Sequence, residues 1–133
     1  MVASKGIIAR LGDQEARTGI MGHPNVVARR LLEVGEEGSL HLNIACDVIA
    51  PGGGIEAHYH DNAAPFDHAY YVIRGRILAK VGDREERVGA NTLIYCPSNV
   101  VHSIENVGKG DAWVLRIVAA KGENTGGKSV FVK

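Results

Sequence analysis

The sequence has few of the features that mark nucleic-acid-binding or membrane-anchored proteins. Fifteen Lys and Arg residues balance fifteen Asp and Glu residues, so the formal net charge is zero. This balance argues against non-specific nucleic-acid binding and against a polybasic membrane anchor. No apolar run approaches the length of a membrane span, and the first five residues lack the apolar stretch of a secretory signal.

Cysteine, proline and aromatic residues are also scarce. The two cysteines, Cys46 and Cys96, form no C-x-x-C pair, which excludes a zinc ribbon and a thioredoxin-type motif. We interpret them as reduced, partly buried thiols of a cytoplasmic protein. Aromatic residues make up 5% of the chain, and 17 glycines stand against 4 prolines, which indicates many tight turns.

Short runs typical of strands dominate the 133 residues, a length that suits one domain. Residues 26–34 fit a helix or a strand equally well, and 129–132 fit a terminal strand or a loosely held end. Short strands separated by turn residues indicate an all-β sandwich or barrel. The clearest expected strands are 40–48, 68–80 with a break at 74–76, 85–88, 92–96, 101–105 and 112–119.

Two of these runs alternate with the period of a half-buried strand. In 40–48 the apolar residues alternate with His41, Asn43, Ala45 and Asp47, and we expect His41 and Asn43 to be exposed rather than to line a pocket. In 112–119 the core is expected to contain Trp113, Leu115 and Ile117. Residues 1–25 are less patterned and are predicted to be an arm or edge strand, leaving 26–133 as the barrel domain.

The chemistry is expected among the histidines in the middle of the chain. His58 and His60 are two residues apart, so on a strand both imidazoles lie on one face. A neutral imidazole is a good ligand for Zn, Fe, Cu and Ni. Taken alone, the pair reads more simply as two solvated surface histidines. A metal site becomes the favoured interpretation in view of the surrounding residues, which are Gly53 and Gly54 before the pair and His68 at the start of the next strand.

The stretch from Gly53 to Gly75 resembles the first motif of the cupin superfamily, and a second cupin motif follows it. The second motif comprises Gly89, Pro97 to Asn99, His102 and Asn106. The family usually has Gly at the position of Asn99, and Asn tolerates left-handed backbone better than other non-glycine residues. The resemblance covers residues 40–119 and implies a single-domain cupin-type jelly-roll β-barrel with a metal site inside.

The resemblance also implies the metal ligands. His58, His60 and His102 match the three histidine ligands of the family, and His68 stands where the family has a carboxylate ligand. Strand parity counted from Gly75 favours His68 over Asp67 as the residue that faces the metal. Four neutral imidazoles leave the full charge on a divalent ion, so the site is expected to favour anionic or chelating oxygen ligands.

For function, the resemblance implies a small-molecule enzyme that uses iron or manganese for dioxygenase-type oxidation of an oxygen-rich substrate. One alternative is a non-redox isomerase, cyclase or lyase that uses zinc or nickel. The other is a non-catalytic ligand-binding cupin, in which a tetrahedral metal has no open position.

Two further residues are candidates for catalysis, and the C-terminal tail is a candidate for a dimer contact. Glu56 shares strand parity with the histidine pair. It is expected either to act as an acid or base at the barrel mouth or to be a solubilising carboxylate on the rim. Tyr70 shares parity with His68 and either hydrogen-bonds a substrate or packs in the core. The resemblance implies a homodimer; the apolar tail Val130–Val132 fits such a contact, and a self-packed end fits too.

Overall fold

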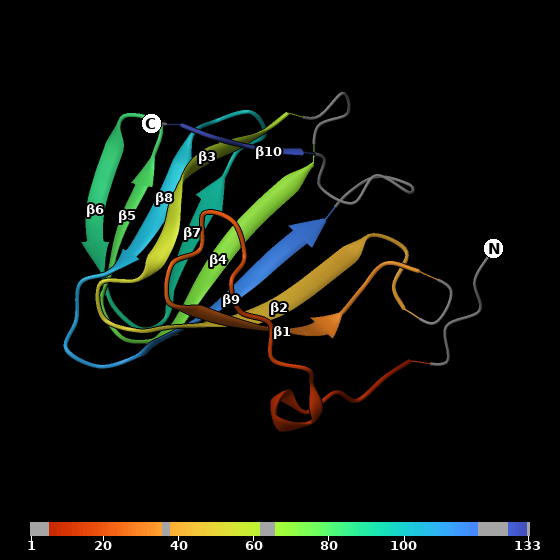
Figure 1. Ribbon diagram of the computed structural model, residues 1–133. Helices are drawn as coiled ribbons and strands as arrows, with labels where there is room; N and C mark the ends of the chain where they lie inside the picture. The colour runs from red at the N-terminus through yellow and green to blue at the C-terminus, as the bar shows by residue number, and fades with distance from the viewer. Residues whose placement is uncertain (1–5, 36–37, 62–65, 120–127, 133) are drawn as a thin grey trace.

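The computed structural model describes residues 6–35, 38–61, 66–119 and 128–132, and these form two five-stranded antiparallel sheets (Figure 1). The first sheet has the strand order β1-β2-β9-β4-β7 and the second β10-β3-β8-β5-β6. The elements are η1 (Leu11–Asp13), β1 (Val26–Leu32), β2 (Leu42–Ile49), β3 (Gly54–Asp61), β4 (Asp67–Arg74), β5 (Ile77–Val81), β6 (Arg84–Val88), β7 (Thr92–Cys96), β8 (His102–Asn106), β9 (Ala112–Ala119) and β10 (Lys128–Phe131).

The chain crosses repeatedly between the sheets, which gives the all-β jelly roll that the sequence predicts. Each predicted run of 40–119 coincides with a strand, and the ambiguous segment 26–34 contains strand β1. Glycine and asparagine turns close the strands, and Asn99 adopts the left-handed conformation expected of it, with φ of 65°. Among the described residues, no helix is long and apolar enough to cross a membrane.

The prediction for the inner face of β9 is wrong. Trp113, Leu115 and Ile117 lie on the outer face and are only partly buried, whereas Ala112, Val114 and Val118 face inward. On β2, likewise, Asp47 is buried and Asn43 is partly buried rather than exposed. Both faces of the first sheet carry apolar residues, so hydrophobicity alone did not mark the inner one.

The interior is divided along the strands into an apolar half and a histidine-rich half. The apolar half includes Ile55 of β3, Val72 of β4 and Ile104 of β8, each at most 2% exposed. Further along the same strands the inward residues become His58, His68 and His102, which are also buried. The apolar half is therefore the hydrophobic core that holds the strands in register, and the other half is available for chemistry.

The segment just before β1 and the C-terminal strand β10 both pack against β3. In the segment before β1, the carbonyls of Gly22 and Pro24 accept hydrogen bonds from the backbone of Glu56 and Gly54. At the other end, β10 pairs with β3 and places Phe131 opposite His58. The tail thus packs on its own sheet, as one of the two readings of residues 129–132 expects.

Asn106 closes the apolar end of the barrel and supplies a test of the fold. Its Nδ2 donates to the carbonyls of Ile49 and Gly110, both at 2.8 Å, and its Oδ1 accepts from the Gly108 amide at 2.9 Å. Because Leu would leave these groups without partners, Asn106→Leu is expected to lower the free energy of unfolding by roughly 2–4 kcal/mol in urea denaturation. The exposed neighbour variant Glu105→Gln is the control, and equal stability of the two variants would contradict this role.

Candidate metal centre

A bulge in β3 brings the first two histidines to the interior. Ile55 pairs with Ile104 of β8, and His58 pairs with His102, so β3 uses three residue steps where β8 uses two. The extra residue lets Ile55 and His58 both face inward, although in a regular strand two residues three positions apart point to opposite faces. His60 follows His58 by ordinary alternation, and β8 contributes His102 directly opposite His58.

Three imidazoles form a tight cluster at this position. The potential ligand atoms of His58, His60 and His102 all lie within 4.8 Å of one another. Two imidazole nitrogens bound to one ion at about 2.1 Å lie roughly 3–4 Å apart. The most widely separated ligand atoms therefore need to approach one another by about 1–2 Å to share an ion.

The backbone orients two of these rings. His58 Nδ1 lies 2.7 Å from the carbonyl of Glu56 in the bulge, and His102 Nδ1 lies 3.0 Å from the carbonyl of Val100. A carbonyl only accepts, so each Nδ1 carries the proton and each Nε2 keeps a free lone pair. The Nε2 atoms of His60 and His102 are buried and have no hydrogen-bond partner. This arrangement is typical of histidines that bind a metal.

His68 lies next to this cluster on β4. Its ring centroid is 5.1 Å from those of His60 and His102, and its side chain is 3% exposed. Both of its ring nitrogens are buried without a partner. Asp67 instead is exposed and accepts a hydrogen bond from the Tyr95 hydroxyl at 2.7 Å. Strand parity thus placed His68, not Asp67, on the inner face.

Burial keeps the four imidazoles neutral. Desolvation, assisted by the neighbouring histidines, lowers the pKa of His58 and that of His60 to about 4. The same cause lowers the pKa of His68 to about 2, and desolvation also lowers the pKa of His102. Neutral imidazole is the form that binds a metal, so the donors are ready near pH 7.

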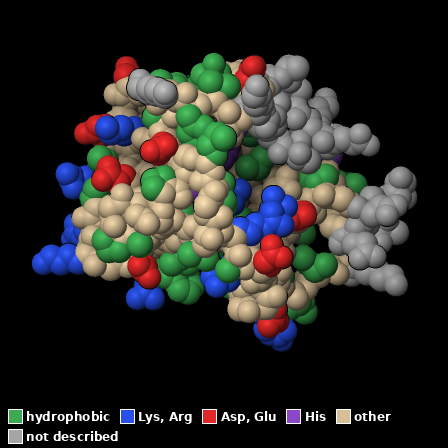
Figure 2. Space-filling model, in the orientation of Figure 1, with side chains coloured by type: hydrophobic (Ala, Val, Ile, Leu, Met, Phe, Trp, Pro, Cys, Tyr) green, Lys and Arg blue, Asp and Glu red, His purple; other side chains and the backbone are tan. Residues whose placement is uncertain are grey.

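A cavity of about 350 Å³ opens beside the cluster, and His58, His60 and His68 line it. In Figure 2 this hollow shows histidine atoms inside and Lys or Arg side chains near its rim. Tyr70 lines the same cavity, with its ring 4.7 Å from that of His68. Burial raises the pKa of the Tyr70 phenol well above its usual value, so its hydroxyl stays protonated and can donate a hydrogen bond.

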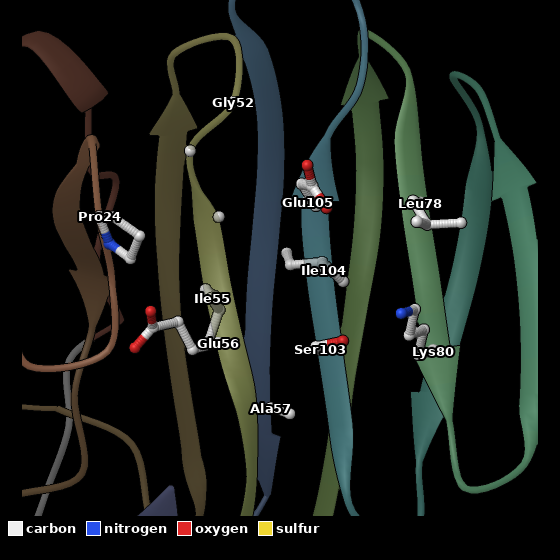
Figure 3. A pocket seen from close by; sticks show the side chains of 12 residues that line it. Pro24, Gly52, Ile55, Glu56, Ala57, Leu78, Lys80, Ser103, Ile104 and Glu105 are labelled. Atoms are coloured by element: carbon white, nitrogen blue, oxygen red, sulfur yellow. The ribbon is translucent and has the colours of Figure 1, made fainter. Parts of the chain in front are cut away.

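The structure does not bring the side chain of Glu56 to the histidines, and the parity prediction for it is wrong. The bulge between Ile55 and His58 reverses the parity that alternation from His58 assigns to Glu56. Glu56 is exposed and lines a separate shallow pocket on the outside of the second sheet, together with Lys80 and Ser103 (Figure 3).

Sequence reasoning missed the other polar residues that line the cavity. Arg17, Arg30 and Arg116 line it, as does His23, for which no role was predicted. Arg116 binds the fully buried Asp47, with Nε 3.0 Å from Oδ2. The presence of one acidic and one basic residue in the middle of two apolar strands was a signal for such an ion pair. Pairing the two residues, however, requires knowing how β2 aligns with β9.

A jelly roll with clustered histidines beside an internal cavity defines a class of barrel suited to holding a metal ion. The family model described as a cupin domain matches residues 47–118, so the chain belongs to the cupin family. A search of curated protein sequences gave no match.

Solved structures share the fold at low sequence identity. The polyketide cyclase RemF from Streptomyces resistomycificus superposes with a TM-score of 0.74 and 19% identity, over 96% of this chain and 87% of its own. KdgF from Halomonas gives 0.73 and 13%, over 90% and 97%. A sugar phosphate isomerase of the cupin superfamily from Silicibacter pomeroyi gives 0.73 and 17%, over 86% and 76%. These likenesses show the fold alone.

Proposed function

We propose that this cupin is a metal-dependent enzyme that oxidises an oxygen-rich small molecule in a dioxygenase-type reaction. The observation that carries the metal-dependent part of the proposal is the set of buried, unpartnered imidazole nitrogens beside a cavity. Buried polar atoms without partners are costly, and one ion would satisfy one nitrogen of each of these rings. Iron or manganese is the favoured metal, and zinc or nickel would also accept imidazole donors.

The proposed ligands are His58, His60, His102 and His68. The first three already cluster within 4.8 Å, and His68 is the adjacent ring, with both nitrogens free. When bound, the divalent ion would supply Lewis acidity, undiminished by any carboxylate ligand. Tyr70, as a neutral donor on the cavity wall, would orient an oxygen atom of the substrate.

The test combines reconstitution with oxygen consumption. The metal-free protein is loaded with Fe²⁺, Mn²⁺, Zn²⁺ or Ni²⁺ and screened with diketones and polyphenols in an oxygen electrode. The proposal expects iron- or manganese-dependent oxygen uptake that matches substrate loss and stops under anaerobic conditions. Turnover that continues without oxygen would overturn the oxidative reaction, and a loaded protein with no turnover on wider panels would favour ligand binding without catalysis.

A non-redox isomerase, cyclase or lyase is the second candidate. It is favoured by the names of two structural neighbours, a polyketide cyclase and a sugar phosphate isomerase. The same neutral imidazoles could hold zinc or nickel for Lewis-acid chemistry on an enolate. Metal-dependent turnover in the absence of oxygen separates this candidate from the first.

We also propose a cytoplasmic homodimer that joins through the outer face of the first sheet. Across β7, β4 and β9 the register aligns Leu93 with Tyr71 and Leu115 in one row, and Tyr95 with Ala69 and Ile117 in the next. Leu93 and Tyr95 are 60% and 51% exposed. Because these two rows contain no charged side chain and leave Leu93 and Tyr95 exposed, the face can pack against a second copy of itself.

This assembly predicts a change of mass on a single substitution. Light scattering is expected to give twice 14.2 kDa for the wild-type protein and 14.2 kDa for Leu93→Glu. Leu40→Glu places the same charge at an exposed leucine outside the sheets and is the control. A wild-type monomer at all concentrations, or a Leu93→Glu dimer, would contradict the interface.

A further inference from the structure

Positive charge dominates the wall of the cavity beside the histidines. Three arginines line it, Arg17 from the segment before β1, Arg30 from β1 and Arg116 from β9. No Asp or Glu is found among the lining residues that the structure describes. These arginines come from three separate parts of the chain, so their convergence is a property of the fold and not of one basic run.

Arg116 is held in place inside the barrel. Its Nε and one Nη atom donate to the two carboxylate oxygens of Asp47, at 3.0 and 3.3 Å, and Asp47 is fully buried. That contact uses one edge of the guanidinium and leaves the Nη1–Nη2 edge available. The charge of Arg116 also acts on His60 and His68, since it disfavours protonation of both rings. Arg116 lines the same cavity as the proposed ligands His58, His60 and His68.

Arg30 and Arg17 stand at the more open side. Their side chains are 50% and 43% exposed, and each has an ion pair at the protein surface, Arg30 with Glu33 and Arg17 with Glu15. Exposed pairs of this kind are weak, so a ligand can compete for either guanidinium. Neither Glu15 nor Glu33 lines the cavity.

Each of the three arginines has one carboxylate partner, Asp47 for Arg116 and the exposed Glu33 and Glu15 for Arg30 and Arg17. None of these carboxylates is among the described residues that line the cavity, and a divalent ion would add two positive charges there when bound. We propose that this cavity binds its substrate by a carboxylate group, held by Arg116 and Arg30, with other substrate oxygens directed to the histidine cluster. The second part rests on the metal-dependent function proposed above, whereas carboxylate binding by the arginines does not.

The geometry of Arg116 favours a carboxylate over a neutral group of the same shape. A guanidinium edge presents two parallel N–H donors, which match the two oxygens of a carboxylate, and a charged pair is stronger than a neutral one. An amide offers one acceptor oxygen and an NH₂ group, which leaves one arginine donor without a partner. The cavity volume of about 350 Å³ limits the ligand to a small molecule.

Calorimetric titration with matched probes tests this assignment. Lactate is compared with lactamide, its uncharged analogue, and with inorganic phosphate, on both metal-free and Mn²⁺-loaded protein. Lactate is expected to bind at least about tenfold more tightly than lactamide. Arg30→Gln is expected to weaken lactate binding about tenfold and to leave lactamide binding and Mn²⁺ content unchanged. Arg29→Gln, the neighbouring arginine outside the cavity, is the control.

Arg116→Gln leaves Asp47 buried without its partner, so the double variant Arg116→Gln/Asp47→Asn, which replaces the pair by neutral amides, tests the same contact. Equal affinity for lactate and lactamide, or insensitivity to Arg30→Gln and to the double variant, would overturn the assignment even if the metal binds and turns over substrate. Tighter, arginine-dependent binding of phosphate would also overturn it. Arginine-dependent lactate binding to a protein that binds no metal would uphold it and instead remove the proposed function.

Discussion

Replacing His68 by leucine is expected to make the metal-free protein more stable and to weaken its metal binding. His68 is 3% exposed, and both ring nitrogens lack partners. A buried polar group without a hydrogen bond costs about 1–3 kcal/mol, and leucine fills a similar volume without that cost. The free energy of unfolding of metal-free His68→Leu is therefore expected to rise by roughly 1–3 kcal/mol, while its metal affinity falls about 100-fold or more.

Urea denaturation of the chelator-treated protein and a metal-binding titration measure the two effects. His41→Leu is the control, because His41 is exposed and far from the cluster in sequence; its stability and metal affinity are expected to stay near the wild-type values. A His68→Leu protein that loses stability and keeps its metal affinity would show that the ring supports the fold and does not bind the ion.

Acid is expected to destabilise the metal-free protein well above the pH at which carboxylates titrate. The folded protein holds the pKa of His58 and His60 near 4 and that of His68 near 2, against 6.5 for the free side chain. Below pH 6.5 the unfolded chain therefore binds protons that the folded chain does not. The stability from these groups is complete above pH 6.5 and is lost as the pH falls towards 4, and His102 acts in the same direction.

The size of this loss is considerable for a small domain. Each histidine contributes up to about 1.4 kcal/mol per pH unit, so by pH 5 each costs roughly 2 kcal/mol. Three such groups approach the total stability of an ordinary domain, which is about 5–15 kcal/mol.

Thermal unfolding of the chelator-treated protein between pH 8 and pH 5 measures the effect. The melting temperature is expected to fall steeply below pH 6.5, with a smaller slope for His68→Leu and an unchanged slope for His41→Gln. A melting temperature that stays constant down to pH 5 would mean that the imidazoles are solvated or paired in the folded protein.

The strands and the inward position of the histidines were accessible from sequence because both depend on short-range patterns. Period-two alternation and the turn residues located the strands of 40–119, and the spacing of His58 and His60 placed both rings on one face. The position of Gly75 fixed the parity of His68, which the structure confirms as buried.

What sequence could not give depends on pairing between distant strands. The extra residue of the β3 bulge is defined only against β8, and without it Glu56 was assigned to the wrong face. The inner face of β9 was misassigned because Trp113 and Leu115 are more hydrophobic than Ala112, although the outer face of this sheet is apolar too. Arg116 was missed for the same reason, since its partner Asp47 lies on another strand.

The most direct test of the four-imidazole site is the X-ray absorption spectrum of the metal-loaded protein, recorded for wild type and for His68→Leu at saturating metal. We expect the scattering of four imidazoles around one ion in the wild type and of three in the variant. Three imidazoles in both proteins would show that His68 is not a ligand, and the absence of imidazole scattering would remove the metal centre altogether.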